Sequence, residues 1–302
     1  MSDKQLAFIF PAFTSDYTDH PGKRITGFEP QFHALLQTAA GLVDSTLSDV
    51  DLDGRTFREN ELHSQYITYI YSCAASSLLR KSGFSPAMSA GYSMGIYASL
   101  FDAGSVSFKT GLELIRLAFR SLKLAIGSEA YGMASLIGLT GRDIHHLIDL
   151  SDLRVEITNQ NAPHSFVVSG YREDILKLLE LAKEEGALHT RDLEVSIPYH
   201  SVFLKEGAMH FAQQISHIEI KNPENQIISL IDQTFLSTPS IIRQELVNNL
   251  FYSLNWFRSK QAMLQNGISV FVECGPSKGL VKNSKFVDGK FLFYSLSSLP
   301  SN

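Results

Sequence analysis

The chain contains a serine at the centre of the pentapeptide GYSMG, which spans residues 91–95. The preceding segment, SPAMSA, suits a short buried strand, and the following residues have the small and apolar spacing of a packed helix. A serine between a strand and a helix, with glycines two places away, is typical of a nucleophile elbow, whose tight turn exposes the hydroxyl group. We therefore predict that Ser93 is a nucleophile and that the N–H of Met94 faces the oxyanion formed beside it.

A nucleophilic serine needs a base to remove its proton, and histidine is the side chain whose pKa lies nearest neutral pH. The chain has ten histidines. Among them, His200 lies in the segment VSIPYHSVFL, directly before a predicted helix and where a predicted small domain returns the chain to a large one. We therefore predict that His200 is the base.

The elements that would position these two side chains alternate between apolar strands and amphipathic helices. Strands are predicted at residues 6–10, 85–90, 227–231 and 270–273, and helices at 32–43, 61–80, 108–126, 202–215, 241–250 and 257–265. This alternation predicts an α/β class, with a large α/β-hydrolase-like domain built on a parallel sheet.

The pattern changes between residues 132 and 197. Strands are predicted at 132–139, 155–158, 166–169 and 188–195, and helices at 142–150 and 172–185. The order βαββαβ is the ferredoxin-like unit. We therefore expect a small ferredoxin-like domain, residues 132–197, inserted into a large domain formed by residues 1–131 and 198–302, with a ligand cleft where the two meet.

Composition narrows the classes of function. The 302 residues are 44% hydrophobic and 19% charged, which is typical of a folded chain with a substantial core. The formal net charge of −5 argues against general nucleic-acid binding. The two cysteines, Cys73 and Cys274, form neither a disulfide framework nor a metal motif, and no apolar run approaches a membrane span. We expect a monomeric cytoplasmic enzyme with no metal, no membrane contact and no nucleic-acid partner.

These segments, in this order, resemble the malonyl-CoA:acyl-carrier-protein transacylase family and the acyltransferase domains of polyketide synthases, over nearly the whole chain. GYSMG stands where that family has GHSxG, and VSIPYHSVFL where it has V-x-x-P-x-H-S. NQNAPHSFVVSG at residues 159–170 and FVECGPSKGL at 271–280 match two further family segments, and Gln65 falls on the glutamine of a T-Q-P-A motif.

The resemblance implies an acyltransferase of fatty-acid or polyketide biosynthesis that works by a ping-pong mechanism. Ser93 would take an acyl group from acyl-CoA and pass it to the phosphopantetheine thiol of an acyl carrier protein, with no permanently bound cofactor. His200 would be the base, oriented by a backbone carbonyl that we assign to Asn255, although this residue also suits the start of a helix. The oxyanion hole would combine the N–H groups of Phe13 and Met94. The acyl pocket would comprise Gln65, Tyr92, Ala118, Asn161 and Tyr199.

Several departures from the family pattern bear on the substrate. Ala12 and Phe13 replace the glycine and glutamine of the family's oxyanion loop, and Tyr92 replaces the histidine before the serine. The arginine that binds malonyl in the family falls on Ala118. Arg116 and Arg120 are each two positions away, which is about 200° around a helix. A buried carboxylate needs a charged partner, so we expect an uncarboxylated acyl group.

Three alternatives remain open. The first is an acyl-carrier hydrolase of the same fold, and the second is a malonyl transferase in which Arg116 or Arg120 reaches the pocket. The third is a catalytically silent carrier-docking subunit, suggested by the altered loop at Phe13 but disfavoured by the presence of both Ser93 and His200.

Lysines near the carboxy terminus, Lys278, Lys282, Lys285 and Lys290, would dock an acidic carrier. An ordinary solvated surface run explains them equally well.

Overall fold

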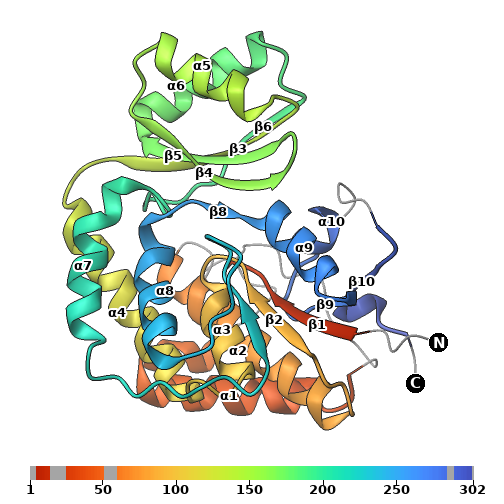
Figure 1. Cartoon of the computed structure of the whole chain (residues 1–302). Coiled ribbons are helices and arrows are strands. Elements are labelled where there is room, and N and C mark those ends of the chain that lie inside the picture. Colours follow the sequence, from red (N-terminus) through yellow and green to blue (C-terminus); the bar gives the residue numbers. More distant parts are fainter. Residues whose placement is uncertain (1–4, 14–24, 51–59, 284–288, 301–302) are drawn as a thin grey trace.

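The computed structural model of the chain describes residues 5–13, 25–50, 60–283 and 289–300, and it contains two sheets (Figure 1). In the larger sheet, neighbouring strands are parallel and follow the order β10, β9, β1, β2, β7. The strands are β1 (Gln5–Phe10), β2 (Met88–Gly91), β7 (Gln226–Ile228), β9 (Ile268–Glu273) and β10 (Leu292–Ser295). The predicted α/β class with a parallel sheet is confirmed.

Helices cover both faces of this sheet, as a parallel sheet requires. They are α1 (Phe28–Leu42), α2 (Glu61–Lys81), α3 (Gly95–Asp102), α4 (Phe108–Ile126), α7 (Lys205–Gln214), α8 (Pro239–Phe251), α9 (Trp256–Gln265) and α10 (Gly279–Asn283). Successive residues of β1 point to opposite faces. Phe8 and Phe10 pack in a core with α1 to α4, α7 and α8, whereas Ala7 and Ile9 pack in a second core with α9 and α10.

The smaller sheet lies above the larger one in Figure 1 and has the order β6, β3, β5, β4, β8. Its elements are β3 (Tyr131–Ile137), α5 (Gly141–Leu150), β4 (Val155–Ala162), β5 (Ser165–Tyr171), α6 (Arg172–Glu184) and β6 (His189–Asp192). The pairs β3 with β5, β3 with β6 and β4 with β5 are antiparallel. This topology is that of the predicted ferredoxin-like unit. Helices α5 and α6 pack on one face of the sheet and enclose a core of their own.

The fifth strand of the smaller sheet comes from outside the predicted range. β8 (Leu254–Asn255) follows α8 and pairs in parallel with β4, with Asn159 opposite Leu254 and Gln160 opposite Asn255. β4 itself runs four residues further than predicted, to Ala162. The sequence did not predict β8, β10, α10 or the short 3-10 helices at Ser45–Asp49 and Leu296–Ser298. The helix predicted at 202–215 begins as a 3-10 turn at Val202–Leu204 and continues as α7.

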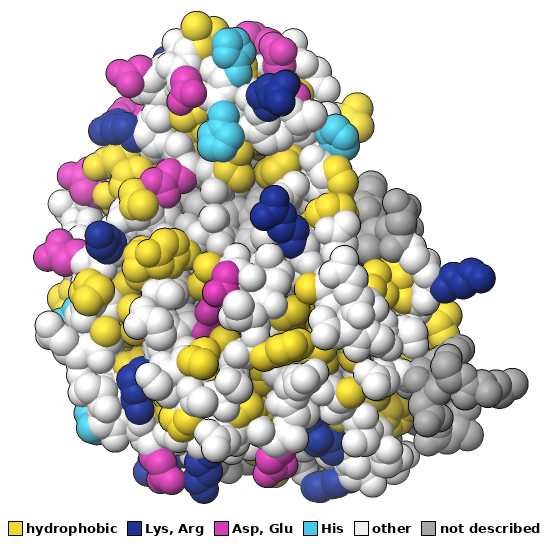
Figure 2. All heavy atoms as spheres, viewed as in Figure 1, with side chains coloured by type: hydrophobic (Ala, Val, Ile, Leu, Met, Phe, Trp, Pro, Cys, Tyr) yellow, Lys and Arg dark blue, Asp and Glu magenta, His cyan; other side chains and the backbone are white. Residues whose placement is uncertain are grey.

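The surface mixes both signs of charge on the face that Figure 2 displays. Within the described part of the chain, no helix combines the length and the apolar character that crossing a membrane would require.

A buried ion pair ties the edge of the larger sheet to its helices. The guanidinium of Arg80, at the end of α2, donates to both carboxylate oxygens of Asp102 at 2.7 and 2.9 Å. The Asp102 side chain is fully buried and also accepts from the Ser89 hydroxyl in β2. Arg80 donates in addition to the side chain of Asn225, beside β7. The pair therefore connects α2, α3 and two strands.

Arg80→Met should destabilise the fold by about 3 kcal/mol, because it leaves a buried carboxylate without its partner. Lys183→Met is the matched control, since Lys183 pairs with Glu180 on an exposed helix surface and such pairs contribute about 0.5 kcal/mol or less. Urea unfolding of both variants measures the difference. Equal losses in the two variants would contradict the structural role of Arg80.

Candidate active site

Ser93 lies in the turn between the end of β2 and the start of α3, as the elbow pattern predicts. Its φ is 56°, in the left-handed region that residues other than glycine adopt rarely. The turn leaves no space for side chains on either flank. A Cβ on Gly91 would collide with the backbone of Ile96, and a Cβ on Gly95 with the carbonyl of Phe10. The two glycines are therefore required by close backbone approach.

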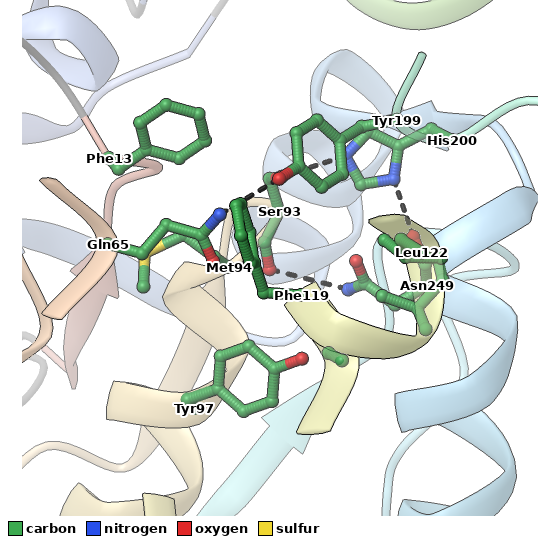
Figure 3. Close-up of a pocket in the computed structure, with 12 residues that line it drawn as sticks. Phe13, Gln65, Ser93, Met94, Tyr97, Phe119, Leu122, Tyr199, His200 and Asn249 are labelled. Carbon is green, nitrogen blue, oxygen red and sulfur yellow. Dashed lines mark hydrogen bonds between the residues drawn. The ribbon is translucent and has the colours of Figure 1, made fainter. Parts of the chain in front are cut away.

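His200 contacts the serine directly. Its Nε2 lies 2.7 Å from the Ser93 Oγ (Figure 3). On the other side of the ring, Nδ1 lies 2.5 Å from the carbonyl oxygen of Asn249. Because a carbonyl oxygen only accepts, Nδ1 carries the proton and Nε2 is left to accept the serine proton. This is the arrangement of a nucleophile and its base.

The end of α8 holds His200 in place. The last four carbonyl groups of a helix have no partner within it. Two of these carbonyls, from Asn249 and Leu250, accept the Nδ1–H and the backbone N–H of His200. The side-chain amide of Asn249 also donates to the carbonyl of Ser93, at 3.4 Å. One helix end therefore positions both members of the pair.

Burial sets the protonation state of the base. His200 is 4% exposed. Removal from water disfavours the charged ring and lowers the pKa of His200 to about 4, although the hydrogen bond to the Asn249 carbonyl opposes this shift. The imidazole is consequently neutral at pH 7 and ready to accept a proton.

The assignment of the orienting carbonyl to Asn255 is wrong. The carbonyl that contacts His200 belongs to Asn249, because α8 ends at Phe251 and exposes its final carbonyls there. Asn255 instead caps α9, where its side chain accepts from the N–H of Arg258, and it donates to Gln160 in β4. The alternative interpretation of Asn255 as a helix-start residue is confirmed.

Ser93 and His200 face a small cavity with a volume of about 20 Å³. All the residues that form its walls belong to the ranges 1–131 and 198–302, which were predicted to form the large domain. The lining residues are Phe13, Gln65, Ser93, Met94, Tyr97, Ala118, Phe119, Leu122, Tyr199, His200, Asn249 and Leu250. Figure 3 shows Met94, Phe119 and Tyr97 around Ser93.

Several predicted site residues meet in this cavity. Phe13 and Met94 lie there with Ser93, as an oxyanion hole requires, and Met94 immediately precedes α3, where the helix dipole favours negative charge. The predicted pocket residues Gln65, Ala118 and Tyr199 also line it.

Two predicted pocket residues lie elsewhere. The Tyr92 hydroxyl donates to the Asn161 side chain at 2.9 Å, and the Tyr92 ring packs edge-on against Trp256. Neither Tyr92 nor Asn161 lines the cavity. Adjacent residues of a turn point in different directions, so the position next to Ser93 faces away from the pocket.

Five further residues line the cavity without having been predicted as site residues, namely Tyr97, Phe119, Leu122, Asn249 and Leu250. The apolar periodicity of the predicted helix 108–126 places Phe119 and Leu122 on its inward face, and this is the signal that the sequence offers for them. Nothing local in the sequence marks Asn249, because its role depends on where α8 ends.

No lysine or arginine is among the residues that line the cavity. Ala118 is buried, at 4% exposed. Arg116 forms a two-point ion pair with Glu113 on its own helix, and Arg120 is exposed.

Of the predicted docking lysines, Lys282 and Lys290 are exposed and Lys278 is half-buried, while Lys285 lies outside the described residues.

Comparison with known proteins agrees with this geometry. Residues 43–285 match the family model described as the acyl transferase domain. The chain is 28% identical over 286 residues to the malonyl CoA-acyl carrier protein transacylase of Bacillus subtilis, covering 92% of this chain and 90% of that protein. It is 27% identical to the Escherichia coli K12 protein of the same description, covering 68% of this chain and 67% of that protein.

Solved structures extend the likeness to the whole fold. An acyl-carrier-protein S-malonyltransferase from Burkholderia pseudomallei matches with a TM-score of 0.86 and 26% identity, covering 98% of this chain and 97% of that one. A type II polyketide synthase malonyl-transacylase, solved in complex with its acyl-carrier protein, matches with a TM-score of 0.89 and the same coverage. Its 22% identity supports the fold alone.

Because the pKa of His200 falls to about 4 on folding from an ordinary value near 6.5, the unfolded chain binds a proton more readily than the folded one. The contribution of His200 to stability should therefore be complete above pH 6.5 and decline as the pH falls from 6.5 towards 4, by up to about 3 kcal/mol. Urea unfolding of wild type and His200→Gln between pH 4 and 7 measures the contribution of His200 to the free energy of unfolding. Parallel stability curves for the two proteins would contradict a depressed pKa.

Proposed function

The chain belongs to the acyl transferase domain family, and we propose that it transfers an uncarboxylated acyl group from coenzyme A to an acyl carrier protein through an ester on Ser93. The observation that carries this proposal is the contact of Ser93 with a buried, neutral His200 in a cavity without a cationic side chain. Family membership makes it an acyltransferase, and the mechanism and the acyl group are the parts that we propose.

The first half-reaction follows from the hydrogen bonds of the site. His200 Nε2 accepts the Ser93 proton while Oγ attacks the thioester carbonyl of acyl-CoA. The N–H groups of Met94 and Phe13 stabilise the oxyanion. The bond from carbon to sulfur then breaks, and the imidazolium returns its proton to the coenzyme A thiolate. The Asn249 carbonyl, held at Nδ1, stabilises the imidazolium in place of a carboxylate.

The second half-reaction runs through the same atoms in reverse. The phosphopantetheine thiol of the carrier gives its proton to His200, and its sulfur attacks the ester carbonyl. The tetrahedral intermediate then expels Ser93 Oγ, which recovers the proton. Phe13 and Tyr199 line the cavity with rings that pack edge to face, 6.1 Å between centroids. These apolar walls exclude water and favour transfer over hydrolysis.

The choice of acyl group depends on Ala118. The family resemblance assigns the malonyl-binding arginine to this position, where a buried alanine lines the cavity. Arg116 is engaged by Glu113, and Arg120 is exposed on the helix. A carboxylate entering the cavity would therefore lose water without gaining a bidentate partner.

Malonyl transfer is the second candidate, because the curated relatives named above are malonyl CoA-acyl carrier protein transacylases. In that case Arg120 would have to turn inwards from its exposed position. A silent docking role is disfavoured by the 2.7 Å contact between Ser93 and His200, since binding alone requires no such pair. For carrier docking we propose the exposed Lys282 and its neighbour Lys278, whose charge would attract an acidic partner.

Wild type should form an acyl adduct on Ser93 more rapidly from acetyl-CoA than from malonyl-CoA, and Ser93→Ala should form none. Ala118→Arg should raise malonyl use by roughly two orders of magnitude, because a paired carboxylate avoids a penalty of about 3 kcal/mol. Intact-protein mass spectrometry and kcat/KM for each acyl-CoA measure both effects. A malonyl preference in wild type that disappears in Arg120→Ala would establish malonyl transfer instead.

The fate of the ester separates transferase from hydrolase. Acyl-enzyme isolated from its acyl-CoA should persist in buffer and lose its acyl group rapidly when the phosphopantetheine form of a carrier is added. Time-resolved mass spectrometry of the Ser93 adduct gives both rates, and a carrier without phosphopantetheine is the control. Loss at the same rate with and without carrier would identify a hydrolase.

A further inference from the structure

A chain of hydrogen bonds runs from the cavity wall to the start of α2. The side-chain amide of Gln65 donates through Nε2 to the Tyr199 hydroxyl at 2.8 Å, and this hydroxyl donates to the Glu61 carboxylate at 2.5 Å. Glu61 is fixed in turn by the backbone N–H and the hydroxyl of Ser196. Figure 3 shows the amide nitrogen of Gln65 directed at Tyr199.

The donor and acceptor groups in this series of hydrogen bonds fix the orientation of the Gln65 amide. An ionised carboxylate only accepts hydrogen bonds, so the single proton of the Tyr199 hydroxyl points to Glu61. The Tyr199 oxygen can then only accept, and the Gln65 group facing it must be the NH₂ donor. The opposite orientation would place the Gln65 carbonyl oxygen against the oxygen of Tyr199, with no proton between them. Through Tyr199, Glu61 therefore fixes the Gln65 amide with Nε2 towards the tyrosine and Oε1 on the opposite side.

The other end of the amide, Oε1, is an acceptor without a donor. Gln65 is 4% exposed and lines the same cavity as Ser93. Among the described residues, the Gln65 side chain donates from Nε2 to Tyr199, and none donates a hydrogen bond to Oε1. A ligand in the cavity that supplies a proton to this acceptor would therefore gain a hydrogen bond that no described residue provides.

From these observations we propose that the cavity selects a short acyl group that carries a hydroxyl, which donates to Gln65 Oε1. This inference rests on the proposed transfer through Ser93 and names its substrate class. The space beside Ser93, about 20 Å³, suits only a short group beyond the thioester carbonyl. A carboxylate of similar size would bring two further acceptors towards Oε1, whereas a hydroxyl brings a donor. The same acceptor could instead hold a water molecule, and the test separates these two sources of a donor.

The test compares acyl-CoAs that differ by one hydroxyl: 2-hydroxyacetyl with acetyl, and 3-hydroxypropionyl with propionyl. In wild type, kcat/KM for Ser93 acylation should favour a hydroxylated member by roughly tenfold, the ordinary effect of one added hydrogen bond. Gln65→Met keeps the length of the side chain but removes the acceptor, so this ratio should fall to about one. Tyr199→Phe removes the hydroxyl that fixes the Gln65 amide, so either end of the amide can face the cavity. The ratio should then fall to an intermediate value, and malonyl use should rise because the amide NH₂ can donate to a carboxylate.

Tyr171→Phe is the control, because it removes a tyrosine hydroxyl that does not line the cavity, and it should retain the wild-type ratio. A purely structural role of Gln65 or Tyr199 would lower all rates together and leave the ratio unchanged. If Gln65→Met does not fold, Tyr199→Phe alone decides.

Equal rates within both wild-type pairs, or a preference that survives in Gln65→Met, would overturn the inference while leaving transfer through Ser93 intact. The water alternative is established, and the inference overturned, if Gln65→Met changes hydrolysis of the acetyl-enzyme but not the ratio. Absence of a Ser93 adduct from every acyl-CoA would overturn the proposed function and this inference together.

Discussion

The end of α8 is the feature on which the candidate site depends. Its unpaired carbonyls hold both the ring and the backbone of His200, and the Asn249 side chain reaches the Ser93 carbonyl. A carbonyl carries only a partial charge, so it fixes the tautomer of the ring and raises the pKa of the imidazole less than a carboxylate would. Burial then dominates and keeps the imidazole neutral. The imidazole is therefore able to accept a proton at neutral pH, whereas an imidazolium in this position would be stabilised less.

The rest of the fold brings this helix end to the serine. Ser93 is presented by a central strand of the larger sheet, whereas His200 follows the last strand of the inserted unit. Both residues have positive φ, 56° for Ser93 and 64° for His200. Such backbone is maintained only where surrounding contacts enforce it. The tight packing of Gly91 and Gly95 enforces it at the serine, and the two carbonyls of α8 enforce it at the histidine.

Much of this could be predicted from local sequence signals. Helix α4 occupies residues 108–126 as predicted, because its apolar periodicity is strong and the Ser107 side chain caps its first turn. The nucleophile elbow at Ser93 and the ferredoxin-like order of strands and helices were also predicted from the sequence. The predictions on Asn255, Tyr92 and Asn161 failed because they required the end of a neighbouring helix or the direction of a side chain in a turn. The two-residue strand β8 has no periodicity to detect, and the link from Glu61 to Tyr199 joins segments far apart in the chain.

The pairing of β8 with β4 has a mechanical consequence. Leu254, which is paired with Asn159 in the smaller sheet, follows Asn249, which holds the histidine, by only five positions. Such a tether spans at most about 17 Å when fully extended. The Ser169 hydroxyl of the same sheet also donates to the carbonyl of Tyr199, next to the histidine. A hinge motion that lifts the smaller sheet would have to break these bonds or pull on the end of α8, and it would then also disturb the contact between Ser93 and His200.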